Sequence, residues 1–163
     1  MLGIGQIETR IAELIRGGRI PTKINQCVQA YQASVTSTTS TSMTDISGLT
    51  KNITPSSVYS QILIMVNVYV SNTSSNTWWT QLVRDSTTIG GDTNDYIDGG
   101  GANASAWNRN RVSVIYIDSP ATTQETTYKV QWKCDGNTLY LNRTGSSDTR
   151  GGTSSITLME VLV

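Results

Sequence analysis

The stretch QILIMVNVYV, residues 61–70, decides the fold of this 163-residue chain. Its β-branched and aromatic residues favour an extended strand, in which successive side chains point to opposite faces. Both faces are mostly apolar, since one carries Ile62, Ile64, Val66, Val68 and Val70 and the other carries Leu63, Met65, Asn67 and Tyr69. A strand of an antiparallel sheet with one face in water would instead alternate apolar and polar residues. We therefore expect two covers for this strand, an opposing sheet on one face and a second copy of the chain on the other.

The stretch SSITLMEVLV, residues 154–163, repeats the two-faced pattern. Because side chains alternate along a strand, one face carries Ile156, Leu158 and Leu162 and the other carries Met159, Val161 and Val163. We assign the first set to the core. Met159, Val161 and Val163 are the predicted subunit interface.

Further strand-like runs with turn residues between them occupy residues 77–85, 111–118, 126–134 and 138–143. The turn Asp135-Gly136-Asn137 predicts a hairpin between the two strands that flank it. The chain also holds 24 Thr and 19 Ser residues, a composition that suits half-solvated strands better than helices. Together these features predict an all-β fold, an antiparallel β-sandwich or jelly roll.

A short helix and an extended arm are predicted ahead of this domain. Residues 5–16 carry apolar side chains at helical spacing, namely Ile7, Ile11, Leu14 and Ile15. Gly17-Gly18 then stops the helix, which is too short to be stable without a surface to fold against. We divide the chain into residues 1–35, the helix and anchoring arm, and residues 36–163, the β-sandwich domain. The Ser/Thr-rich run from Thr36 is either a linker or an edge strand, and we favour a linker followed by a strand.

Composition argues against several functions. The 12 basic and 12 acidic residues balance and form no basic run, so we expect no nucleic-acid partner. The chain has no His, the commonest general base and metal ligand, so we expect no enzymatic activity, metal or cofactor. Its apolar runs are far shorter than the roughly 20 residues that span a bilayer, and we expect neither a membrane partner nor a signal peptide. Cys27 and Cys134 lack metal or redox spacing and are expected to be two buried thiols, although the sequence leaves a disulfide open.

The glycine-rich stretch GDTNDYIDGGG, residues 91–101, gathers several acidic residues. Asp92, Asn94, Asp95 and Asp98 suggest a calcium loop, but Tyr96 and Ile97 stand where that loop needs a ligand and a glycine. Asp95 and Asp98 are also a close carboxylate pair of the kind that glycosidases use, yet their loop fixes no catalytic geometry. We favour a structural role for these residues in a polar loop.

Tryptophan side chains offer flat apolar faces on which sugar rings stack. Trp78 and Trp79 are adjacent, so they point to opposite sides of a strand and one of them belongs to the core. Trp132 alternates with apolar residues and is assigned to the core. We select Trp78 and Trp107 as the candidate glycan-stacking residues.

Several ordered landmarks resemble a known type of domain. They are TSTTSTSMTDISGLTKNITPSS from Thr36, SQILIMVNV from Ser60, RDSTTIGGDT from Arg84, IDSPATTQETTYKVQWK from Ile117 and the closing SSITLMEV. Over residues 36–163 the chain resembles a β-domain common in structural proteins of tailed bacteriophages, especially aquatic and cyanobacterial ones. The resemblance implies a trimeric jelly-roll head, found at tips of tail fibres and in capsid decoration, or cement, proteins.

The resemblance and the doubly apolar strands together lead to one functional hypothesis. The chain is expected to be a homotrimeric capsid decoration protein, made in the host cytoplasm and exposed on the surface of the virion. Its N-terminal segment would dock on the major capsid protein of a phage shell through Ile4, Ile7, Ile11, Leu14 and Ile15. The alternative is a tail-fibre head that binds a host surface glycan. We favour decoration because a fibre generally carries a long repetitive shaft, for which residues 1–35 are too short.

Overall fold

The computed structural model describes residues 23–72, 77–101, 108–144 and 151–162. These ranges contain eleven β-strands and no helix. The predicted all-β class is therefore confirmed for the described part of the chain. The predicted N-terminal helix and its anchor residues fall within residues 1–22, outside that part. Among the described residues no helix is long and apolar enough to cross a membrane.

Sheet A is built around the strand that the sequence singled out, β4 (Gln61–Asn72). One edge of β4 pairs antiparallel with β8 (Asn108–Asp118) along its whole length. The other edge pairs first with β11 (Ser154–Leu162) and then with β10 (Leu139–Leu141). β1 (Lys23–Gln32) completes the sheet beside β11, and β2 (Thr36–Thr38) does so beside β10. β4 is thus the central strand.

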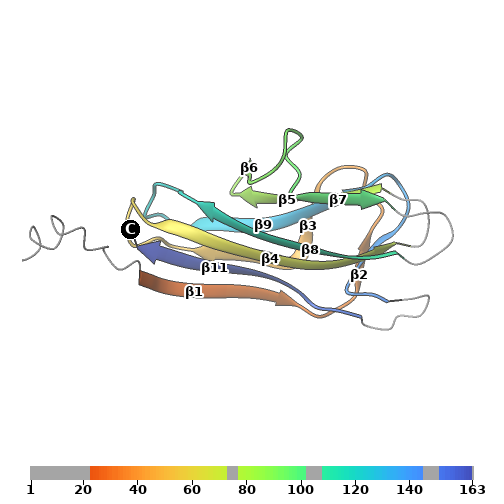
Figure 1. The fold of residues 1–163 in the computed structure, drawn as a ribbon, viewed down its shortest axis with the longest axis horizontal. Helices are drawn as coiled ribbons and strands as arrows, with labels where there is room; N and C mark the ends of the chain where they lie inside the picture. The colour runs from red at the N-terminus through yellow and green to blue at the C-terminus, as the bar shows by residue number, and fades with distance from the viewer. Residues whose placement is uncertain (1–22, 73–76, 102–107, 145–150, 163) are drawn as a thin grey trace, which may run out of the picture.

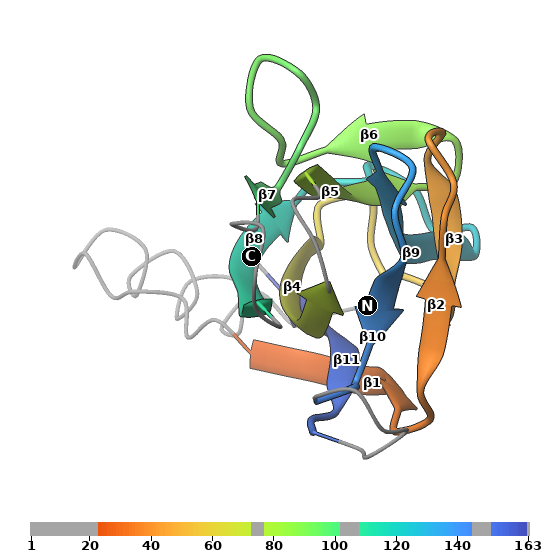
Figure 2. The same cartoon turned by 90° about the vertical axis from the view of Figure 1, so that its right-hand side faces the viewer.

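Sheet B faces sheet A and has five strands. Its order is β3 (Thr44–Ile53), β9 (Thr126–Cys134), β5 (Thr77–Arg84) and β6 (Thr87–Ile89), with β7 (Asp98–Gly101) also paired to β5. The two sheets lie against each other as an elongated sandwich (Figures 1 and 2). All its ladders in the described part are antiparallel.

The core lies between the two sheets. The even-numbered side chains of β4, Ile62 to Val70, are at most 2% exposed, so the opposing sheet covers this face of the strand. Sheet B contributes Trp78, Leu82, Tyr128, Val130 and Trp132. Ile156 and Leu158 of β11 are fully buried, which confirms their assignment to the core, whereas Leu162 is only partly buried.

Three local expectations differ from the structure. The turn Asp135-Gly136-Asn137 does not close a hairpin, because β9 belongs to sheet B and β10 to sheet A, and the chain crosses between the sheets there. The Ser/Thr-rich run begins with the short strand β2, so the edge-strand alternative holds at Thr36–Thr38. Cys134 is buried but Cys27 is exposed, since Cys27 lies on the solvent side of the outermost strand, and both are free thiols.

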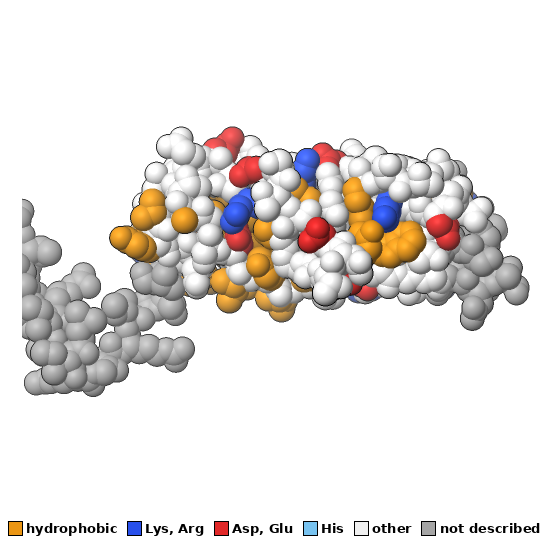
Figure 3. All heavy atoms as spheres, turned by 90° about the horizontal axis from the view of Figure 1, so that it is seen from above, with side chains coloured by type: hydrophobic (Ala, Val, Ile, Leu, Met, Phe, Trp, Pro, Cys, Tyr) orange, Lys and Arg blue, Asp and Glu red, His pale blue; other side chains and the backbone are white. Residues whose placement is uncertain are grey.

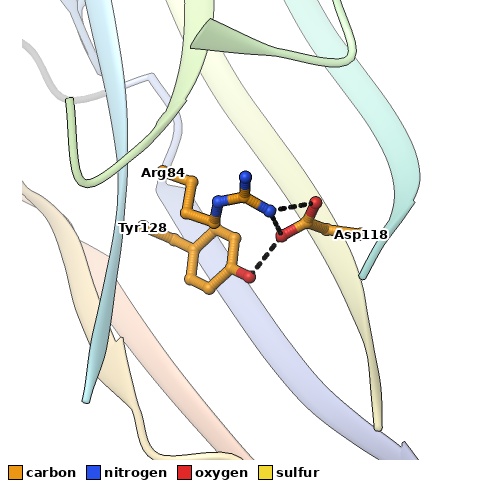
Figure 4. Close-up of polar contacts among 3 residues, drawn as sticks. All are labelled: Arg84, Asp118 and Tyr128. Carbon is orange, nitrogen blue, oxygen red and sulfur yellow. Dashed lines mark hydrogen bonds and ion pairs between the residues drawn. The ribbon is translucent and has the colours of Figure 1, made fainter. Parts of the chain in front are cut away.

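One end of the sandwich carries a buried acidic group that joins the two sheets. Asp118, at the end of β8, accepts hydrogen bonds from Arg84 Nη1 at 2.8 and 2.9 Å and from the Tyr128 hydroxyl at 2.6 Å (Figure 4). Burial, followed by the bond to Asp118, raises the pKa of Tyr128 well above its usual 10. The Tyr128 hydroxyl therefore stays protonated and remains a donor to the carboxylate.

A second buried carboxylate, Glu160 of β11, lies in the same row of the sheet. Ile62 of β4 is paired with Asp118 on one side and with Glu160 on the other. Glu160 is 0% exposed and accepts five hydrogen bonds, from Asn25 Nδ2, Gln26 Nε2, Ser56 N, Ser56 Oγ and Ser60 Oγ. These donors come from β1 and from the turn before β4, so the carboxylate fastens the edge strand to the sandwich.

The hydrogen bonds determine the ionisation of Glu160. Burial by itself raises the pKa of the carboxyl group, but the bonds from Asn25, Ser60, Gln26 and Ser56 outweigh burial and lower the pKa from 4.5 to about 2. A carboxyl whose pKa is lowered on folding stabilises the folded state above its unfolded pKa. That stabilisation is lost as the pH falls through the folded pKa.

We predict that Glu160→Gln lowers the free energy of unfolding at pH 7 by about 3 kcal/mol, the equivalent of the pKa shift at 1.36 kcal/mol per unit. The wild type loses this contribution as the pH falls from 4.5 to about 2, so its stability converges toward that of the variant. Urea denaturation at a series of pH values measures both effects. Glu125→Gln, at an exposed position, is the control and keeps the wild-type pH dependence. Equal pH dependence of Glu160→Gln and wild type would contradict the prediction.

Candidate functional site

The candidate site is the outer face of sheet A, the face turned away from sheet B. Paired residues of neighbouring strands lie on the same face of a sheet. Leu63 of β4 is paired with Ile117 of β8 and Met159 of β11. Met65, two residues along β4, is paired with Ile115 of β8. Apolar side chains of three adjacent strands therefore form neighbouring rows on this face.

The edge strand β1 extends these rows. Ile24 is paired with Val161, and Cys27, whose thiol is exposed, is paired with Met159. We use the name apolar patch for the side chains that these rows bring together on four strands, namely Ile24, Leu63, Met65, Ile115, Ile117, Met159 and Val161.

The apolar patch is strongly exposed in the single chain. Ile115 is 70% exposed, Ile117 55%, Ile24 56% and Met65 40%, while the other members are half-buried. Isolated exposed apolar side chains are ordinary, but a contiguous group of this kind marks an interaction surface.

The apolar patch carries no charged side chain. The charged residues of β8 on the same face, Arg109 and Arg111, lie toward the other end of the strand. Arg111 is occupied there, since its Nη1 donates to Asn67 Oδ1 at 2.8 Å and its guanidinium carbon lies 5.6 Å from the centre of the Tyr69 ring. Two such patches can therefore meet without opposing like charges.

The amphipathic pattern is inverted at this end of the sheet. Ile117 points outward beside the inward Asp118, and Met159 points outward beside the inward Glu160. The buried carboxylates have their hydrogen bonds from within the chain, as described above. The outward apolar side chains have no such cover among the described residues.

The structure places two of the three predicted interface residues on this face. Met159 and Val161 are half-buried members of the apolar patch, and Val163 lies outside the described residues. Sequence reasoning missed Ile115 and Ile117, the two most exposed members on β8. The signal was present in the run VIYI, residues 114–117, in which consecutive apolar residues must occupy both faces of the strand.

The choice of Trp78 as a stacking residue was wrong. Trp78 is only 2% exposed because it points into the core, and its neighbour Trp79 is the one that faces outward. Trp107 lies outside the described residues. In the acidic loop, Asp92 Oδ1 accepts the backbone N–H groups of Asn94 and Tyr96 at 2.8 and 3.1 Å, as expected for a structural role.

Comparisons with known proteins find similarity of overall shape only. No known protein family and no curated protein matches the chain. Solved structures of the infectious bursal disease virus are similar: a crystal structure of the viral particle has a TM-score of 0.46 and 13% identity, over 86% of this chain and 32% of that chain. The structure of the Gx strain has a TM-score of 0.40 and 15% identity, over 85% of this chain and 38% of that chain. The chain thus spans about a third of the length of these viral chains, and with TM-scores this low we take no functional argument from the likeness.

The two faces of β11 predict opposite responses to a charge. Leu158→Lys places an unpaired charge at a fully buried position, which costs several kcal/mol and abolishes cooperative unfolding. Met159→Lys, one residue further, extends from the outer face, and the folded sandwich is retained. Circular dichroism and thermal unfolding of the two variants measure this difference. Loss of folding in both variants would contradict the assignment of the faces.

Proposed function

We propose that this protein is a virion structural protein, a homotrimeric capsid decoration protein that stabilises a phage shell. The single observation that carries the proposal is the uncharged apolar patch on the outer face of sheet A. The sequence resemblance to β-domains of tailed-phage structural proteins supports the choice of a trimer and of a phage particle. The role is mechanical, and it requires no catalytic group.

The patch favours a second copy of the chain as its occupant. Subunit interfaces have apolar centres and few charged residues, and the patch has both properties. A closed ring of three subunits buries one such face of each subunit toward a common axis. The exposed Ile115 and Ile117 lie on β8, whose far edge has no partner strand among the described residues, so a neighbouring subunit can approach from that side.

The N-terminal segment is proposed as the shell anchor. Lys23, the first described residue, is paired with Leu162 at the end of β11, so the described part of the chain begins at the end of sheet A that carries the apolar patch. Ile4, Ile7, Ile11, Leu14 and Ile15 are the proposed contacts with the major capsid protein. One short segment binds weakly, but three segments on one trimer raise the effective concentration of each further contact.

We predict that the protein is a trimer in solution, with three times the single-chain mass of 17.7 kDa. Light scattering coupled to size exclusion at micromolar concentration measures the mass. Ile115→Lys introduces like charges at the interface and yields folded monomers. Tyr59→Lys, at a 77% exposed position in the turn before β4, is the control and leaves the trimer intact. A wild-type monomer would rule out the trimer.

The anchor predicts that a chain starting at Lys23 remains a folded trimer but no longer binds shells. The truncation must not extend into β1, because this strand pairs with β11 and its Asn25 and Gln26 bind Glu160. Ile11→Asp in the full chain is expected to have the same effect. Co-sedimentation with phage shells stripped of the protein measures binding.

Glu13→Gln, on the polar side of the predicted helix, is the matched control and keeps binding. Wild-type binding by the truncated chain would rule out the anchor. A truncated chain that loses its trimeric state would instead show that residues 1–22 belong to the subunit interface.

A further inference from the structure

A hollow on the side of sheet B is separate from the apolar patch. Seen from the side of β5, β6 and β7, the surface is mostly polar, and its hydrophobic side chains lie in a few separate patches (Figure 3). The hollow has a volume of about 550 Å³, within the range of sites for small molecules. It is lined by residues of β5, of the loop before β7 and of β7 itself, namely Thr77, Trp79, Asp92, Asn94, Tyr96, Ile97, Asp98, Gly99, Gly100 and Gly101.

The two aromatic rings of the hollow are held in place. The ring centres of Trp79 and Tyr96 lie 5.9 Å apart. Lys133 Nζ lies 4.8 Å from the Trp79 ring centre and 5.0 Å from that of Tyr96, and it donates a hydrogen bond to the Tyr96 hydroxyl at 2.8 Å. On its other side Trp79 is paired with Gly99, where an added Cβ would come within 3.0 Å of Trp79 Cδ1. Glycine at this position therefore leaves room for the indole beside the strand.

The loop that carries Tyr96 is also fixed. The Asp92 backbone N–H donates to Tyr96 O at 3.0 Å, and Ile97 N–H donates to Thr80 O on β5 at 2.9 Å. These bonds add to those that Asp92 Oδ1 accepts from the same loop. The aromatic wall of the hollow is thus preorganised, which lowers the entropy cost of binding a ligand.

The polar groups of the hollow indicate the class of ligand. Asp92 and Asp98 provide carboxylates and Asn94 an amide, groups that pair with hydroxyls, while the aromatic rings provide an apolar face. The carboxylates disfavour an acidic ligand. The ammonium group of Lys133 already makes cation–π contacts with both rings, so the rings do not favour a cationic ligand.

We propose that this hollow binds a neutral saccharide, whose C–H face packs on Trp79 and Tyr96 and whose hydroxyls pair with the acidic loop. The inference does not depend on the proposed trimer. The apolar patch is on sheet A and the hollow is on sheet B, and the two have no residue in common.

An array of neutral oligosaccharides of glucose, galactose, mannose and N-acetylhexosamines, with sialylated and sulfated oligosaccharides beside them, tests the proposal on the full-length protein. Isothermal titration with the best-bound neutral oligosaccharide then compares variants. Trp79→Ala is expected to weaken binding about tenfold or more, the loss that follows from one aromatic contact.

A second variant blocks the hollow without removing a ring. Among the described residues, an added Cβ at Gly101 meets only Thr77 Oγ1, at 3.9 Å. Gly101 alternates with Gly100, whose added Cβ would meet the buried Trp78. Gly101→Leu therefore extends into the hollow with the fold intact and is expected to abolish binding. Tyr59→Ala removes an aromatic ring that is 77% exposed and lies outside the hollow, and this variant keeps wild-type affinity.

Binding that is lost in Trp79→Ala and Gly101→Leu but kept in Tyr59→Ala supports the proposal. It is overturned if no neutral oligosaccharide binds at millimolar concentration, if only acidic oligosaccharides bind, or if both hollow variants bind as the wild type does. The mass of the wild type and of each variant in solution, measured in parallel, tests the proposed trimer separately from saccharide binding.

Discussion

The structure depends on the burial of one face of β4. This strand is hydrogen-bonded along both edges, and its even-numbered side chains from Ile62 to Val70 are buried against sheet B. A shift of one residue would turn all of these side chains to the solvent, so burial fixes the register of β4. Because β8 and β11 pair with β4 residue by residue, the same constraint determines which of their side chains point inward.

That constraint explains the unusual end of the sandwich. Asp118 and Glu160 are both paired with Ile62, so their side chains lie on the core side of the sheet together with that of Ile62. Buried carboxylates are costly unless other groups compensate their charge. Asp118 is paired with Arg84 and accepts a hydrogen bond from Tyr128, and Glu160 accepts hydrogen bonds from neutral groups of β1 and of the turn before β4. At this end of the sandwich, polar networks join the two sheets and hold the edge strand β1. In the rest of the sandwich, apolar packing joins the two sheets.

The same alternation places apolar side chains outside. With acids on the inner face, Ile117 and Met159 must lie on the outer face, next to Ile115 and Met65. The two outer surfaces of the sandwich consequently differ in chemistry. Sheet A presents an uncharged apolar patch, which suits a protein surface, and sheet B presents a hollow with aromatic and acidic walls, which suits a small polar ligand. The proposed particle-bound trimer, with one face of each subunit toward its own copies and another toward the surroundings, would use both surfaces.

The sequence by itself determined the class of fold and most strand positions, because alternation and β-branched residues act locally. It also determined that QILIMVNVYV has two apolar faces and that Met159 and Val161 lie opposite Ile156 and Leu158. Only the tertiary structure decided which strands are neighbours: the turn after Cys134 crosses between sheets where a hairpin was expected, and Trp78 is buried where Trp79 is not. Alternation defines two faces but does not say which one meets the opposing sheet. That choice is made by pairing partners distant in sequence, which is why the apolar patch and the Trp79 hollow appear only when the strands are assembled.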